Sequence, residues 1–407
     1  MKVLIINWAW YPTGGDWTYI ENVIKMYENH GHEVIPFSTV HPKNIETKYN
    51  DYFVKSHDYK KLQTNLTLEN GLRALNSSIV SNDAISKLRT LIEKTKPTIA
   101  HLQNIHHYIT PAIINVLKEF KIKIIWTLHD FKIICPQNSF ISNGKVCEKC
   151  INGNFFNCAL NVCKKESFLV STLASFDAYY YHSKKIYDQV DYFLCPSDFL
   201  KSKFKQFGFD ESKLHLVHSC YDIEVIDQFL EQTTNNFQEK YALYIGRLED
   251  IKGVDTLIEA VIDTPIKLKI AGSGAAQKKL RQMAAGHQNI EFMGHLTKNE
   301  IFKLTQNAAF VVCPSTCYEN LPFSVIESFL FSKAVIGSNI GGIPELIKEE
   351  ETGLLFEPGN PAHLCEKMRH LWQNEQLAIE YGATARKFIG NLVNYDVHYK
   401  KIMEVIN

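Results

Sequence analysis

Short runs of apolar and β-branched residues recur along the chain, and segments long enough for helices separate them. The first half holds four such runs, at 3–7, 98–104, 123–130 and 192–197. A short continuous apolar run is typical of a strand that is buried on both faces of a parallel sheet. The pattern therefore predicts βαβ units in this half. Residues 40–97 show no pattern clear enough to predict an element.

A second series of apolar runs, more closely spaced, follows in the C-terminal half. Each half can close its own doubly wound sheet, so the sequence predicts an α/β protein with two Rossmann-like domains that face a central cleft. We place the boundary after residue 222, which gives domains at 1–222 and 223–388. The runs of the second series lie at 241–247, 267–274, 289–294, 308–315, 333–339 and 353–359.

The composition indicates a globular chain without a strong electrostatic bias. Of the 407 residues 45% are apolar, and 44 basic residues balance 44 acidic ones. A neutral chain offers no basic surface for nucleic acid, so we expect no nucleic-acid partner. The N-terminal apolar run is too short for a signal peptide, and no stretch approaches the roughly 18 apolar residues of a membrane-spanning helix. We expect a cytoplasmic protein and leave peripheral contact with a membrane surface open.

Two features of the first half could face a ligand at the carboxyl ends of the strands. Gly14 and Gly15 follow the first strand, and glycines at a strand-to-helix corner let the backbone approach an anion closely. A plain tight turn explains them equally well. His129 ends the strand at 123–130, where it could hydrogen-bond a hydroxyl or phosphate or move a proton. A structural role is the alternative for a lone histidine.

Two cations mark the corner after the first strand of the second half. Arg247 leaves that strand and Lys252 lies five residues on, just before a glycine and a helix. A guanidinium and an ammonium at such a corner could hold a diphosphate, although two solvated surface cations fit the same spacing. Gly272 and Gly274 lack the third glycine of the dinucleotide fingerprint, so the pattern does not indicate a hydride-transfer cofactor.

The segment CYENLPFSVIES, at 317–328, places Glu319 and Glu327 on either side of a proline. Pro322 suits the first turn of a helix, which leaves Glu319 in the loop before it and Glu327 in its second turn. The helix N-terminus would favour a phosphate near the amides of residues 320, 321 and 323. Alternatively, Glu319 only complements the helix dipole and Glu327 is a solvated helix residue.

These residues resemble the retaining glycosyltransferases of family 4, which have the GT-B fold. Glu319, seven intervening residues and Glu327 match the family's EX7E motif. The diglycine loop at 14–15, TLHD, YIGRLEDIKG, AGSG, FMGHL and SNIGGIPELI are also similar and occur in order. The similarity covers nearly all of the second half, and in the first half it is confined to the glycine loop, His129 and the strand ending at Ser197.

The resemblance implies transfer of a sugar from a UDP- or GDP-sugar, with retention at the anomeric carbon and no metal at the reaction centre. The acceptor would be a hydroxyl of a glycan or a lipid-linked sugar in surface polysaccharide or glycoconjugate synthesis. A helix near 389–407 would cross back onto the first domain. By the same analogy Arg247 and Lys252 hold the diphosphate, Glu327 binds the ribose, and Glu319 and His129 act on the donor sugar with the backbone of Asn320, Leu321 and Phe323.

Two other classes of protein stay open on this architecture. A nonhydrolysing nucleotide-sugar epimerase shares the two-domain design, although the context of Glu319 and Glu327 argues against it. A sugar-binding protein without turnover would keep the same cations.

A cysteine-rich insertion at 131–165 departs from the usual family pattern. It holds five of the ten cysteines of the chain. A CxxC pair followed by two more cysteines fits a four-thiolate structural zinc site that closes a loop too polar to build its own core. Free thiols or an exposed disulfide are the alternatives. The expected zinc ligands are Cys147, Cys150, Cys158 and Cys163, and Cys135 is left outside the site.

Overall fold

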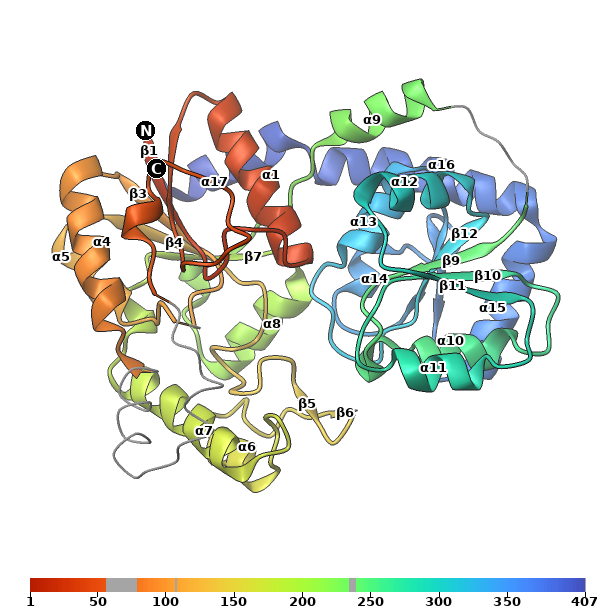
Figure 1. The fold of residues 1–407 in the computed structure, drawn as a ribbon, viewed down its shortest axis with the longest axis horizontal. Coiled ribbons are helices and arrows are strands. Elements are labelled where there is room, and N and C mark those ends of the chain that lie inside the picture. Colours follow the sequence, from red (N-terminus) through yellow and green to blue (C-terminus); the bar gives the residue numbers. More distant parts are fainter. Residues whose placement is uncertain (56–78, 107, 234–238, 407) are drawn as a thin grey trace. The chain divides into compact units, whose positions relative to one another are not determined.

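The computed structural model of the chain describes residues 1–55, 79–106, 108–233 and 239–406 (Figure 1). Contacts within the chain divide it into two compact units. Parts of the predicted domains 1–222 and 223–388, and the last residue of the predicted helix 389–407, lie outside the described residues. Unit 1 is made of Met1–Asn143, Cys147–Val217 and His398–Asn407, and unit 2 of Gly144–Val146 and His218–Val397.

Unit 1 is built on a six-stranded parallel sheet in the order β2-β1-β3-β4-β7-β8. The four predicted strands are present, and β2 and β8 are two strands that the apolar runs did not predict. Pro36 interrupts β2, which tolerates a proline because it is an edge strand, and β8 is only three residues long. The strands are β1 (Lys2–Ile6), β2 (Glu33–Phe37), β3 (Ile99–Leu102), β4 (Lys123–Thr127), β7 (Tyr192–Cys195) and β8 (Leu214–Leu216).

The helices of unit 1 begin where the sequence supplies capping side chains. The hydroxyls of Ser81, Ser167 and Ser197 each accept a backbone N–H of the first turn, of α4, α7 and α8 respectively, which satisfies a donor that the helix itself leaves unpaired. A short hairpin, β5 (Ile141–Ser142) and β6 (Lys145–Val146), precedes α6. The helices are α1 (Gly15–Asn29), α4 (Asn82–Thr95), α5 (Ile113–Glu119), α6 (Phe156–Leu160), α7 (Phe168–Ser183) and α8 (Asp198–Phe207).

Unit 2 has a second six-stranded parallel sheet, in the order β11-β10-β9-β12-β13-β14. All six strands correspond to the predicted runs, so the two doubly wound sheets expected from the sequence are confirmed. From β9 to β11 successive strands are added toward one edge of the sheet, and from β12 to β14 toward the other, so the topological switch point lies between β9 and β12. Ligands of such sheets bind at the carboxyl ends of the strands at the switch point. The strands are β9 (Ala242–Ile245), β10 (Leu268–Ala271), β11 (Ile290–Gly294), β12 (Phe310–Cys313), β13 (Val335–Ser338) and β14 (Gly353–Phe356).

Helices cover both faces of the second sheet because alternate residues of its strands point to opposite sides. In β9, Tyr244 packs in the same buried cluster as Leu257 of α10, whereas Leu243 packs with Ile326 of α13. The helices are α9 (Ile223–Gln232), α10 (Val254–Val261), α11 (Gln277–Met283), α12 (Lys298–Asn307), α13 (Phe323–Leu330), α14 (Ile343–Leu346), α15 (Pro361–Gln373) and α16 (Glu375–Leu392).

The last helix, α17 (Tyr395–Ile406), contacts α1 of unit 1. The buried His398 Nε2 lies 3.2 Å from the Tyr19 hydroxyl, and the Tyr399 ring stacks on His30 at 3.7 Å between centroids. The predicted segment 389–407 therefore spans the end of α16 and the whole of α17. Within the described ranges, none of the helices combines the length and the apolar character needed to cross a membrane.

Candidate functional site

Two loops of unit 2 meet at the switch point of its sheet. One follows β9 and carries Arg247 and a short turn, Asp250–Lys252, and the other follows β12 and leads to α13. The Thr316 N–H of the second loop donates to the Ile251 carbonyl of the first at 3.0 Å. Gly253 has φ +65°, and a Cβ on it would lie 2.0 Å from the Pro314 carbonyl oxygen. Glycine is therefore required for this close approach of the two backbones.

A largely buried ion pair joins Lys252 to Glu319 at this site. Lys252 Nζ lies 2.5 Å from Glu319 Oε1, and only 18% and 16% of the two side chains are exposed. The Ser315 hydroxyl donates to the same oxygen at 2.7 Å. Burial raises the pKa of Glu319, but Lys252 and Ser315 outweigh it and hold the pKa below its ordinary value. Burial also lowers the pKa of Lys252, but the Glu319 carboxylate outweighs this effect. The Lys252 pKa is therefore raised above its ordinary value. Both groups are therefore charged at neutral pH.

A second backbone crossing fixes the position of Glu319. The Gly342 N–H donates to the Glu319 carbonyl at 2.7 Å. A Cβ on Gly342 would lie 1.8 Å from the Asn320 carbonyl oxygen, so a side chain there would push the loop away. Gly342 belongs to the SNIGGIPELI segment. The sequence alone does not predict that this segment contacts the loop that carries Glu319.

The second carboxylate of the motif lies within α13. Glu327 Oε1 accepts a hydrogen bond of 2.9 Å from the Tyr221 hydroxyl. Burial raises the pKa of Glu327, and Tyr221 and Lys298 act in the opposite direction. The structure thus gives Glu327 a buried partner that the sequence did not predict, because Tyr221 lies 106 positions away.

The start of α13 differs slightly from the prediction. Pro322 has extended backbone and lies immediately before the helix rather than in its first turn. Leu321 is buried in the core of unit 2, so only its backbone can serve a ligand. Phe323 begins the helix, and its ring centroid lies 6.3 Å from that of Tyr221. Whether the amides of Asn320, Leu321 and Phe323 bind a ligand stays a prediction.

The two predicted cations have different surroundings. The Arg247 side chain is 66% exposed and pairs with Glu249 at 2.7 Å. These surroundings agree with the alternative in which Arg247 is a solvated surface cation. Lys252 is instead buried against Glu319. The two cations are therefore not equivalent, and their joint action on a diphosphate stays a prediction.

In unit 1, His129 follows β4 and is held by Gln103. Its Nε2 lies 2.6 Å from Gln103 Oε1, and because an amide oxygen only accepts, Nε2 carries the proton and Nδ1 can accept one from a hydroxyl. The ring packs edge-on against Tyr19, with centroids 5.1 Å apart. Burial lowers the pKa of His129 to about 4, partly opposed by Asp16. The imidazole is therefore neutral at pH 7.

The diglycine lies at the N-terminus of α1, where Gly14 precedes the helix and Gly15 is its first residue. The Asp16 carboxylate occupies this end, accepting hydrogen bonds from the Thr13 hydroxyl at 3.0 Å and the Asn104 amide at 3.1 Å. Because Asp16 already places a negative charge at the positive end of the helix dipole, an anion there would meet repulsion. Ligand binding by the diglycine stays a prediction.

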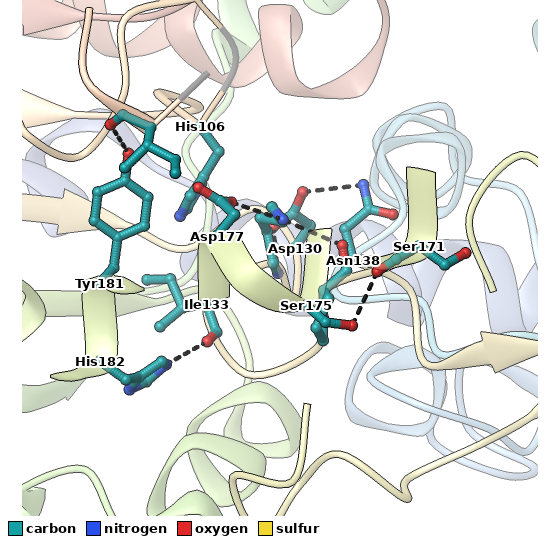
Figure 2. A network of polar contacts seen from close by, with 12 residues as sticks. His106, Asp130, Ile133, Asn138, Ser171, Ser175, Asp177, Tyr181 and His182 are labelled. Carbon is teal, nitrogen blue, oxygen red and sulfur yellow. Dashed lines mark hydrogen bonds and ion pairs between the residues drawn. The ribbon is translucent and has the colours of Figure 1, made fainter. Parts of the chain in front are cut away.

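A buried charged network anchors the loop that follows His129 to α7 (Figure 2). Asp130 accepts the Lys132 N–H at 2.8 Å and the Asn138 amide at 3.4 Å. The Lys132 ammonium lies 3.3 Å from Asp177 of α7. Apart from the position of Asp130 next to His129, no feature of the sequence predicts this network. It is positioned to stabilise the backbone that carries the histidine.

The cysteine-rich insertion has a small core of its own, which corrects the expectation that it is too polar to build one. Phe155 packs with Cys150 and Cys158 against Ala178 of α7, because a neutral thiol behaves as a small apolar group. The Cys147 and Cys163 side chains are half-buried, and all these cysteines are free thiols. Among the residues that the structure describes, no three His, Cys, Asp or Glu side chains are arranged to hold a metal ion. The zinc site stays a prediction.

Comparisons with known proteins cover both units. Residues 13–225 match a family model described as Glycosyltransferase Family 4, and residues 225–388 match one described as Glycosyl transferases group 1. An uncharacterized glycosyltransferase of Methanocaldococcus jannaschii is 31% identical over 38% of this chain, and the D-rhamnosyltransferase WbpZ of Pseudomonas aeruginosa 32% identical over 39%. The chain matches less than half the length of these two relatives, 44% and 42%.

Other similarities extend over most of the chain. An uncharacterized 42.6 kDa protein from the cps region of Klebsiella pneumoniae is 25% identical over 85% of this chain and 87% of its own length. The structure of Anabaena HepE in complex with UDP and glucose aligns with a TM-score of 0.68 at 16% identity, covering 100% of this chain and 99% of HepE. At this identity the likeness shows that the two proteins share the GT-B fold.

Proposed function

Because the chain belongs to glycosyltransferase family 4, we propose that it transfers a sugar from a nucleoside-diphosphate donor to a hydroxyl of a glycan or lipid-linked acceptor, in surface polysaccharide or glycoconjugate synthesis. The proposed transfer retains the anomeric configuration and takes place in the cytoplasm. The observation that carries the proposal is the Lys252–Glu319 pair, which lies on the loops after β9 and β12, at the switch point of a doubly wound sheet.

Lys252 and Arg247 are proposed to hold the diphosphate of the donor. Departure of the diphosphate builds negative charge, and cations already in place stabilise that charge without rearrangement. Glu319 holds the Lys252 ammonium at one edge of the site, and the N-terminus of α13 adds its dipole. These groups supply the positive charge that a metal would otherwise bring, so the proposal includes no catalytic metal.

The two glutamates are proposed to bind different parts of the donor. Glu327 would bind the ribose hydroxyls, since a carboxylate bonded to a tyrosine hydroxyl keeps oxygen lone pairs for further donors. Glu319 would contact the sugar. Because Glu319 is ion-paired and Glu327 is hydrogen-bonded to Tyr221, neither is a free nucleophile, which supports attack of the acceptor on the same face that the diphosphate leaves.

His129 is proposed to act on the donor sugar as a neutral hydrogen-bonding group. With Nε2 donating to Gln103, Nδ1 can accept a hydrogen bond from a sugar hydroxyl. Its depressed pKa removes the positive charge that would otherwise compete for the diphosphate.

A uridine diphosphate sugar is proposed as the first donor to test, because the HepE structure, which shares this fold, contains UDP and glucose. A guanosine diphosphate sugar is the second. Incubating the protein with a panel of α-linked UDP- and GDP-sugars and a lipid-linked sugar acceptor, and reading the anomeric proton of the product by NMR, tests the proposal.

An α-linked product that Glu319→Gln fails to form supports it. A β-linked product refutes retention. The same panel without acceptor separates the alternatives, since an isomerised donor sugar indicates an epimerase. Donor binding without turnover in any acceptor mixture indicates a sugar-binding protein.

A further inference from the structure

Helix α7 presents most of its large apolar side chains to solvent and, apart from Tyr181, small and polar ones to the protein. Its outer arc consists of the exposed residues 168, 169, 176, 179 and 183 and the half-buried residues 172, 173 and 180, which follow helical spacing and include no charged residue. Phe168 and Leu169 are 58% and 53% exposed, and Phe176 is 50% exposed. Its buried residues are Ser171, Ala174, Ser175, Ala178 and Tyr181. This arrangement reverses the usual amphipathic helix, whose apolar face is buried.

The polar contacts of α7 explain why this orientation is fixed (Figure 2). Ser175 donates to the Phe155 carbonyl at 2.8 Å, and the His182 ring contacts the Ile133 carbonyl at 2.8 Å. Asp177 pairs with Lys132 on the same inner side. Rotating the helix to bury its aromatic arc would break these contacts, so the apolar arc remains outside.

The exposed arc continues onto α6. The Phe156 N–H donates to the Tyr179 hydroxyl at 3.2 Å, which places the two helices side by side. Six of the twelve exposed large hydrophobic side chains of the described residues lie in this short stretch. We call these six residues the α6–α7 apolar surface: Phe156, Leu160, Phe168, Leu169, Phe176 and Tyr179.

Lysines bracket the α6–α7 apolar surface. Lys165 precedes α7, and Lys184 and Lys185 follow it, about 24 Å away along a 16-residue helix. Between residues 165 and 185 three exposed lysines stand against two acidic residues, one of which, Asp177, pairs with Lys132 inside the protein. An apolar and aromatic strip with cations at both ends matches an interface of acyl chains and anionic headgroups.

We propose that the α6–α7 apolar surface docks unit 1 on a bilayer that contains anionic phospholipid. The apolar side chains would enter the headgroup and acyl boundary, and the lysines at the two ends would contact the phosphates. The inference is independent of the proposed transfer reaction. It would nevertheless bring the protein to a surface where a lipid-linked acceptor resides.

The test is co-flotation of the full chain with vesicles of phosphatidylcholine alone or mixed with phosphatidylglycerol. We expect binding to the mixed vesicles. Phe168→Ser/Leu169→Ser should lower the partition coefficient about tenfold or more, the scale of losing buried apolar side chains. Lys184→Glu/Lys185→Glu should lower the partition coefficient more for the mixed vesicles than for phosphatidylcholine vesicles. Added salt should likewise lower the binding of the parent to the mixed vesicles more than to phosphatidylcholine.

Matched controls lie in unit 2. Ile379, 56% exposed on α16, provides Ile379→Ser, and exposed lysines of α12 and α16 provide Lys303→Glu/Lys387→Glu. These variants should bind as the parent does, and all variants should unfold at the parent's temperature. Absence of parent binding, or equal binding by Phe168→Ser/Leu169→Ser, overturns the proposal. It is also overturned if that variant abolishes a dimer seen by analytical ultracentrifugation while vesicle binding is unchanged, because the surface would then be an interface between copies.

Discussion

The candidate ligand-binding regions of the two units are built in different ways. In unit 2 the region is charged, with Lys252 and Glu319 buried together and Glu327 bonded to Tyr221. In unit 1 its central group is a neutral His129 held by Gln103, and the nearby carboxylates, Asp16 and Asp130, are both hydrogen-bonded within the chain. Both regions lie where the carboxyl ends of parallel strands meet a helix N-terminus, so the fold alone does not determine this difference.

The difference follows from what each helix N-terminus already holds. Asp16 satisfies the end of α1 with a carboxylate from the chain itself, whereas α13 begins after an apolar segment, Leu321–Pro322, and has no acidic residue in its first turn. A helix end without its own anion suits an anionic ligand. We therefore expect unit 2 to hold the diphosphate and unit 1 to contact neutral hydroxyl groups.

The largest expected effect comes from Lys252. Lys252→Ala should lower kcat/KM by about 10²–10³-fold, the scale of losing one donor to a developing oxyanion. It should also lower the free energy of unfolding by about 3–5 kcal/mol, because Glu319 is left buried without its partner.

Arg247→Ala is the matched control for this prediction, because it removes an exposed cation from the same loop. It should lower kcat/KM with a change in unfolding free energy of less than about 1 kcal/mol. Steady-state kinetics and urea unfolding measure both. If the two variants were equally stable, the buried pair would not have the role assigned to it.

A smaller effect is expected at Glu327. Glu327→Gln should raise the donor Kd about tenfold and leave kcat near the parent value, because ribose contacts are alike in the ground and transition states. Glu319→Gln should instead lower kcat. Tyr221→Phe, which removes only the hydroxyl that bonds Glu327, should change Kd in the same direction by less. Calorimetric titration with the donor measures Kd, and a kinetic assay measures kcat. If Glu327→Gln lowered only kcat and left the donor Kd unchanged, the proposed division of roles would be wrong.

The cysteine-rich insertion offers a prediction confined to unit 1. Protein purified without chelator should carry about one zinc per chain, bound by Cys147, Cys150, Cys158 and Cys163. Removing the metal should impair acceptor use more than donor binding, since the cations proposed to hold the donor diphosphate lie in unit 2. Elemental analysis with native-state thiol alkylation is the measurement. Cys195→Ser, which removes a cysteine of β7 outside the insertion, should leave the metal content unchanged. If fresh protein contained no metal and all four thiols were alkylated in the native state, the zinc hypothesis would be wrong.

The smallest expected effect is the pH dependence of unit 1. Folded His129 has a pKa of about 4 against an ordinary value of 6.5, so between these values the unfolded chain binds more protons. Stability should therefore fall as pH falls from about 6.5 toward 4. His129→Gln should reduce this loss by a few degrees in melting temperature, and His370→Gln, which removes an exposed histidine of α15, should not. Equal acid sensitivity of the parent and His129→Gln would show that the histidine is not buried neutral.

Most strands could be predicted from the sequence because buried parallel strands are short apolar runs, whereas β2, which contains Pro36, and the three-residue β8 show no such run. Glu319, Glu327 and Lys252 could be identified as candidates because of their position in strand-to-helix loops. Their contacts could not be predicted, since Lys252 and Glu319 are 67 positions apart and strand order alone brings the two loops together. The core of the insertion could not be predicted, because Ala178, against which Phe155, Cys150 and Cys158 pack, lies outside the insertion.

The most direct test of the account is a thermal-shift measurement with UDP, GDP and ADP on the parent and on Lys252→Ala. A ligand that binds only the folded chain raises its stability by RT ln(1 + [L]/Kd). We predict that at least one nucleotide, UDP first, raises the melting temperature of the parent, and that Lys252→Ala loses most of this shift relative to its own ligand-free baseline. Equal shifts in the two proteins, or no shift with any nucleotide in the folded parent, would contradict the claim that the Lys252–Glu319 site binds the diphosphate.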